Sequence, residues 1–161
     1  RKGDLDAVWT IEPWVSRLVL EAGARVYFEE RALWPQTGGK YATTQLVSGV
    51  RFLGANPGFV RKWIHAHVEL TDWINENPEE AKRVLNEEIR AETSRAFPSE
   101  LVNSAWRRLE FSYDPAKESV MKVAEDAHKI GFLRSQPDLS RIYHLDPLNA
   151  VLREKGREEV R

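Results

Sequence analysis

Apolar and polar residues alternate with a helical period through most of the chain after residue 56. Apolar positions recur every three or four residues, which is the spacing of one face of an α-helix. This pattern predicts helices over roughly 57–75, 78–93, 99–109, 115–130 and 147–155. Four of these helices follow an Asn-Pro or Asp-Pro pair, which favours a capped helix start with proline at the first helical position. These pairs are Asn56-Pro57, Asn77-Pro78, Asp114-Pro115 and Asp146-Pro147.

The first fifty residues have a different pattern. Short runs of apolar, β-branched and aromatic residues predict strands over Leu5–Trp9, Arg25–Phe28 and Tyr41–Val50. A helix that begins after Glu12-Pro13 and ends at Gly23 separates the first two strands. Because strand–helix–strand units normally build parallel sheets, the fold class expected is α/β.

The predicted sheet is too small for the number of predicted helices. A parallel sheet is buried on both faces, and three short strands are too few to cover so many amphipathic helices. The chain also begins at Arg1 rather than Met. We therefore expect either a removed leader or, more in keeping with the missing sheet, a piece of a longer protein.

Composition excludes several classes of protein. The 161 residues contain 24 Lys and Arg against 25 Asp and Glu, a formal charge of −1, whereas a general nucleic-acid binder needs a basic surplus. No apolar run approaches the length of a membrane span. The absence of cysteine excludes disulfides and thiolate chemistry. Six tryptophans are many for this length.

The helix start at Glu12-Pro13 is the main candidate for a binding site. Glutamate caps helices poorly, so Thr10 or the backbone would cap this helix and leave Glu12 exposed. Alternatively, the strand end and helix start line a cleft, in which the backbone N–H groups of Trp14 and Val15 face an anion and Trp9 and Trp14 form the walls. Thr43 would offer a hydroxyl from its strand, or would simply be a β-branched strand residue.

Other polar groups suggest no chemistry. His65 and Glu69 are one helical turn apart without a third ligand nearby, which indicates a surface pair rather than a metal site. Charged stretches such as Arg107-Arg108 are typical of solvated helix faces. No nucleophile elbow, phosphate loop or dinucleotide motif is present. The sequence therefore predicts no catalytic residue, no cofactor and no metal.

The order of motifs along the chain resembles a known family. Gly3, Leu5-Asp6-Ala7 and Glu12-Pro13 are followed by Tyr41–Thr44, Asn56-Pro57, Trp73–Ala81, Leu109–Phe111 with Asp114-Pro115, and Asp146–Asn149. This order is similar to that of the substrate-binding proteins of ABC importers, of the aliphatic sulfonate, nitrate and taurine (NMT1/THI5-like) type.

The resemblance implies the C-terminal half of a type II periplasmic-binding-protein fold, in which two lobes close on a ligand. Residues 1–33 would end the second lobe, residues 34–50 would form the hinge and crossing strand, and residues 51–161 would pack on a first lobe absent from this chain. The ligand-binding residues that it implies are Trp9, Thr10, Glu12, Pro13, Trp14 and Thr43. Since Glu12 argues against simple anion capture, it would accept from an amine or amide, or point away.

The function implied is that of an extracytoplasmic, periplasmic solute-binding component for a small anionic solute, without enzymatic activity. Its partners would be the ligand and an ABC permease in the membrane, with a homodimer through exposed apolar helix faces and no nucleic acid. Two alternatives stay open: thiamine-pyrimidine precursor binding or synthesis on the same fold, and a helical protein-interaction module.

Overall fold

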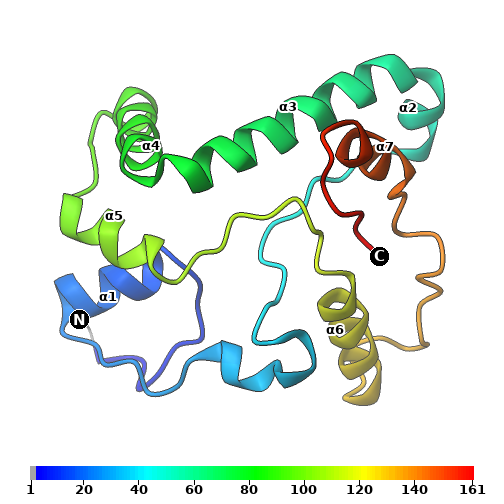
Figure 1. Ribbon diagram of the computed structural model, residues 1–161. Coiled ribbons are helices and arrows are strands. Elements are labelled where there is room, and N and C mark those ends of the chain that lie inside the picture. Colours follow the sequence, from blue (N-terminus) through cyan, green and yellow to red (C-terminus); the bar gives the residue numbers. More distant parts are fainter. Residues whose placement is uncertain (1–2) are drawn as a thin grey trace. The chain divides into compact units, whose positions relative to one another are not determined.

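The computed structural model describes residues 3–161, and every regular element in this range is a helix (Figure 1). None of the helices described is long and apolar enough to cross a lipid bilayer. The α-helices and the two short 3₁₀ helices are α1 (Trp14–Ala22), η1 (Glu30–Leu33), η2 (Pro35–Thr37), α2 (Val50–Ala55), α3 (Pro57–Glu76), α4 (Pro78–Thr93), α5 (Ser99–Trp106), α6 (Lys117–Lys129) and α7 (Asp146–Glu154).

The chain divides into two compact units. The first contains the described residues up to Glu29 together with Asp72–Phe111, and the second contains Glu30–Thr71 together with Ser112–Arg161. One boundary falls inside α3. The division expected from the sequence, at residues 33 and 50, concerns the lobes of a larger protein and stays a prediction; its first two residues lie outside the described range.

The first unit is built on α5, which contacts both α1 and α4. Leu101, Val102 and Ala105 of α5 are buried, as the helical spacing of these apolar residues requires. The turn between α4 and α5 is held by Asn86, whose side-chain amide donates to the carbonyl oxygen of Phe97 (2.9 Å) and accepts from its N–H (2.7 Å). One side chain thus satisfies both backbone groups of a residue that no helix satisfies.

The second unit has an apolar core between α3 and α7. The core side chains are Val68 of α3 with Leu148, Val151 and Leu152 of α7. Asn149 of α7 fastens the end of the chain to this core, because its amide both donates to and accepts from the backbone of Val160 at 2.9 Å. At the solvent edge, the hydrogen bond from Lys155 lowers the pKa of Glu69 below its usual range.

The helices predicted after residue 56 are all present, and α4 has the predicted limits. The predicted capping is wrong in part. Asn56 and Asn77 donate their side-chain amides backward, to the carbonyl oxygens of Phe52 (3.1 Å) and Trp73 (3.0 Å). They therefore satisfy carbonyl groups at the end of the preceding helix. Asp146 is the first residue inside α7 and caps nothing with its side chain.

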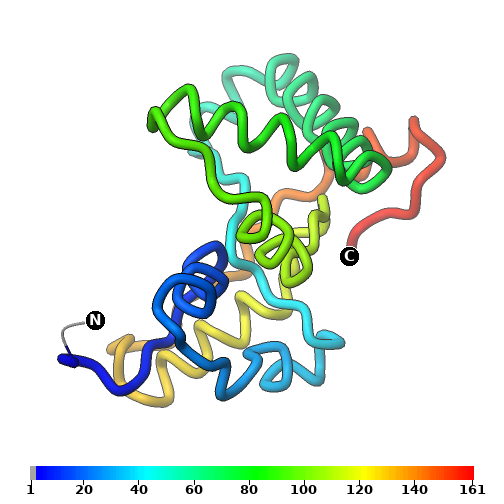
Figure 2. Tube along the Cα trace, turned by 90° about the vertical axis from the view of Figure 1, so that its left-hand side faces the viewer, coloured from blue at the N-terminus to red at the C-terminus, as the bar shows by residue number. Residues whose placement is uncertain are grey.

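The predicted α/β class is wrong, and with it the type II fold with about three short N-terminal strands. Residues 3–161 contain no strand, and Figure 2 traces the segments before α1 and between η2 and α2 without helical turns. A strand forms only when its backbone groups pair with a neighbouring strand. Residues 3–161 offer no partner strand, and side chains such as Tyr27 and Val47 stay exposed.

Side chains rather than a sheet hold the segment predicted as the third strand. The N–H of Ala42 donates to the buried hydroxyl of Ser119 in α6 (3.0 Å), which donates in turn to the carbonyl oxygen of Ala116 (2.8 Å). Gln45 donates to the hydroxyl of Tyr143 at 3.1 Å. The β-branched residues of this segment thus indicated that it is not helical. They did not indicate which groups its backbone and side chains would contact.

Replacing Leu152 with alanine tests the core between α3 and α7. Because this side chain is fully buried, we expect Leu152→Ala to lower the free energy of unfolding by about 2–5 kcal/mol. The matched substitution Leu70→Ala removes an exposed leucine from α3 and should cost less than about 1 kcal/mol. Urea titration monitored by circular dichroism measures both, and equal losses would contradict the assigned core.

Candidate functional site

Five of the six candidate binding residues lie together around the start of α1. Trp9 is 72% exposed and Trp14 is 54% exposed, whereas Thr10, Glu12 and Pro13 between them are partly buried. The sixth candidate, Thr43, belongs to the second unit, where it is exposed. The structure therefore gathers the first five in one unit, with two tryptophans outward and Glu12 inward.

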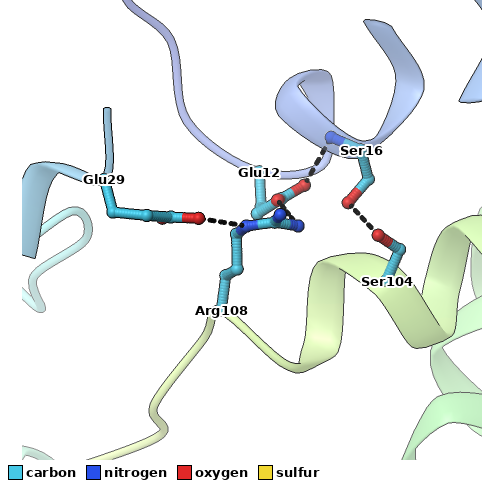
Figure 3. A network of polar contacts seen from close by, with 5 residues as sticks. All are labelled: Glu12, Ser16, Glu29, Ser104 and Arg108. Atoms are coloured by element: carbon cyan, nitrogen blue, oxygen red, sulfur yellow. Dashed lines mark hydrogen bonds and ion pairs between the residues drawn. The ribbon is translucent and has the colours of Figure 1, made fainter. Parts of the chain in front are cut away.

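Glu12 is the centre of a polar network within the first unit (Figure 3). Its side chain is only 4% exposed, and its Oε1 forms an ion pair with Nη1 of Arg108 at 3.3 Å. Its Oε2 accepts the backbone N–H of Ser16 at 3.1 Å. The Nε of Arg108 also contacts Glu29 Oε1 at 3.2 Å. Arg108 thus joins the segment before α1, the segment after α1 and the end of α5.

This geometry corrects two expectations about the start of α1. The N–H groups of Trp14 and Val15 are not free for an anion, because both donate to the carbonyl oxygen of Ile11, at 3.0 and 3.3 Å. The N–H of the next residue donates to Glu12. Glu12 is not exposed. It precedes Pro13, the N-cap residue of α1, and its carboxylate lies at the end of the helix where the dipole favours a negative charge.

Two features of the site went unrecognised in the sequence. Arg108 was expected on a solvated face, but its side chain is 29% exposed and paired with two carboxylates. In addition, the buried hydroxyl of Ser16 donates to that of Ser104 (2.9 Å), linking α1 to α5. The available signal was a serine among the apolar positions of each helix.

Metal-ligating groups do not gather in the described part of the chain. Among residues 3–161 no group of three or more His, Cys, Asp or Glu side chains is placed to hold a metal ion. His65 lies 3.4 Å from Glu69, and Glu69 also pairs with Lys155. This agrees with the surface pair predicted from the spacing.

Removing Arg108 should destabilise the first unit. Arg108→Ala would leave the Glu12 carboxylate nearly buried without its cation, and one-sided removal of a buried pair is strongly unfavourable. Since Arg108 is partly exposed, we expect a loss of about 2 kcal/mol. Arg107→Ala, the neighbouring exposed arginine, should cost less than about 0.5 kcal/mol.

Urea titration measures both variants, and hydrogen exchange at the Ser16 amide reports on the site itself. Exchange of that amide should accelerate in Arg108→Ala and not in Arg107→Ala. Unchanged exchange in both would show that Glu12 holds its position without Arg108.

The comparisons with known proteins support the resemblance at the level of the family, over the first 87 residues. No curated protein and no solved structure matches the chain. The model of the NMT1-like family matches residues 1–87, which is more than half of the 161 residues and includes the start of α1, Glu12 and Thr43. The chain therefore belongs to the NMT1-like family, which is related to the substrate-binding proteins of ABC importers.

Proposed function

We propose that this chain is a solute-binding component of an ABC importer, for a small anionic solute of the sulfonate, taurine and nitrate class. The observation that carries the proposal is the family match over residues 1–87, the part of the chain that contains all six candidate residues. The component would capture its solute and present it to a membrane permease outside the cytoplasm. No bond of the solute would be made or broken.

The surroundings of Trp14 support an anionic solute. The guanidinium of Arg17 lies over the Trp14 ring, 5.7 Å from its centre. It is partly exposed, and its Nε is also paired with Oε2 of Glu21 at 2.9 Å. A cation beside an exposed aromatic ring offers both charge and an apolar surface to a small organic anion. Trp9 and Trp14 are therefore the side chains that we assign to ligand contact in this unit.

Glu12 has a different role in this proposal. Both of its carboxylate oxygens already accept hydrogen bonds from groups of the first unit. Its negative charge would also repel an anionic solute placed beside it. We therefore assign Glu12 to holding the segment between Trp9 and Trp14 in place. It is a positioning residue, and the aromatic residues on either side contact the solute.

The thiamine-pyrimidine alternative belongs to the same family and remains the second candidate. An aromatic heterocycle would stack on Trp9 or Trp14 without needing the cation of Arg17. A homodimer through apolar helix faces stays a prediction from the sequence.

Ligand titration distinguishes these candidates. We expect taurine, an alkyl sulfonate or nitrate to change the intrinsic tryptophan fluorescence, with an affinity weakened about tenfold or more by Trp9→Ala and by Arg17→Gln. The matched control is Tyr27→Ala, which removes another exposed aromatic residue of the same unit. Isothermal titration calorimetry measures each affinity.

The results distinguish the two candidate solutes and test the location of the site. Binding of a pyrimidine that is insensitive to Arg17→Gln would favour the thiamine-precursor alternative. If Tyr27→Ala weakened binding as much as Trp9→Ala, the assignment of the site to the start of α1 would be wrong.

A further inference from the structure

The guanidinium of Arg17 is held from two sides by neighbouring residues of α1. Trp14, Arg17 and Glu21 are three and four residues apart, which is the spacing of neighbours on a helix surface. The Nε of Arg17 pairs with Oε2 of Glu21 at 2.9 Å, and the guanidinium carbon lies 5.7 Å from the centre of the Trp14 ring. All three side chains stay in contact with solvent. The guanidinium is therefore oriented and accessible at the same time.

The pair between Arg17 and Glu21 contributes little to the helix itself. A carboxylate in the last turn lies at the negative end of the helix dipole, and α1 has no basic residue in that turn. The order of arginine before glutamate is also the less favourable one for an ion pair four residues apart. Exposed ion pairs in general stabilise folded proteins weakly. The effect that remains is the one on Arg17, whose long side chain Glu21 keeps in one orientation.

This orientation leaves most donors of Arg17 for an outside acceptor. A guanidinium has five N–H donors, one on Nε and four on the two terminal nitrogens. Glu21 accepts from Nε, whereas no hydrogen bond from Nη1 or Nη2 of Arg17 is found among residues 3–161. The parallel N–H groups of these two nitrogens match two oxygens of one carboxylate or similar anion.

We propose that Arg17 binds an oxyanion through both terminal nitrogens, and that Glu21 is the positioning residue that holds the guanidinium beside Trp14. This inference rests on the proposed function and specifies which atoms meet the solute. Because Glu21 compensates the charge of Arg17, the geometry of the hydrogen bonds rather than net charge selects the solute. The site therefore prefers anions that offer two oxygens, such as a sulfonate or nitrate, over a spherical anion such as chloride.

Isothermal titration calorimetry of the full chain tests the contact with Arg17. We expect sodium nitrate and sodium methanesulfonate to bind more tightly than sodium chloride. Arg17→Lys keeps the charge but loses the paired donors, so it should weaken the binding of nitrate and methanesulfonate about tenfold. The matched control is Arg90→Lys, which changes an exposed arginine of α4 in the same unit and should leave these affinities unchanged.

Two variants of Glu21 test its positioning role. Glu21→Ala should weaken binding roughly threefold, because the solute must then order the arginine side chain. Glu21→Gln should restore the affinity to within about twofold of the wild type, since its amide oxygen still accepts the Nε–H. A merely structural effect on α1 would have the opposite order, because alanine favours helices more than glutamine. Glu88→Ala removes an exposed glutamate of α4 and serves as the control.

Three results would overturn the proposal. Tighter binding by Glu21→Ala would show that this carboxylate competes with the anion. Full affinity of Arg17→Lys, with binding still lost in Trp14→Ala, would exclude the contact through two nitrogens and leave the proposed function intact. Failure of nitrate and methanesulfonate to bind the wild type would overturn both the contact and the proposed function.

Discussion

The ion pair between Glu12 and Arg108 is the constraint on which the first unit depends. A nearly buried carboxylate is costly unless a cation and further hydrogen bonds compensate it, and Glu12 obtains both from Arg108 and the Ser16 amide. Because Arg108 also contacts Glu29, one side chain fixes the segments on either side of α1 against the end of α5. The segment that presents Trp9 and Trp14 is thereby positioned by charge rather than by a sheet.

Elsewhere, polar side chains satisfy the backbone hydrogen-bonding groups of the irregular segments, as strand pairing does in a sheet. Asn86 and Asn149 each bind both backbone groups of a residue outside the helices. Ser119 accepts a backbone N–H from the segment before α2. Backbone groups without a partner are rare in folded proteins, so these few side chains decide where the chain between helices lies. The apolar core between α3 and α7 therefore packs helices against each other, and the irregular segments are held by polar side chains instead.

The aromatic residues that this arrangement leaves outside are the ones available for binding. Trp9 and Trp14 flank the Glu12 network in the first unit, and Phe52, Phe59 and Trp63 form the exposed cluster of the second. In the first unit the guanidinium of Arg17, which is also paired with Glu21, lies over the Trp14 ring. The two groups differ in composition, because the first pairs a single ring with a cation, whereas the second consists of three rings in contact with one another.

The sequence by itself determined the helices after residue 56, because helical hydrogen bonds join residues four apart and the signals that start and end them are equally local. It also located the start of α1 as the candidate site and indicated the family. It failed for the strands at Leu5–Trp9, Arg25–Phe28 and Tyr41–Val50, since a strand exists only with a partner that the segment itself does not specify. Only the tertiary structure decided the role of Glu12, whose partner lies 96 residues away. Charge patterns cannot reveal such a pairing, because buried and solvated carboxylates look alike until the chain has folded.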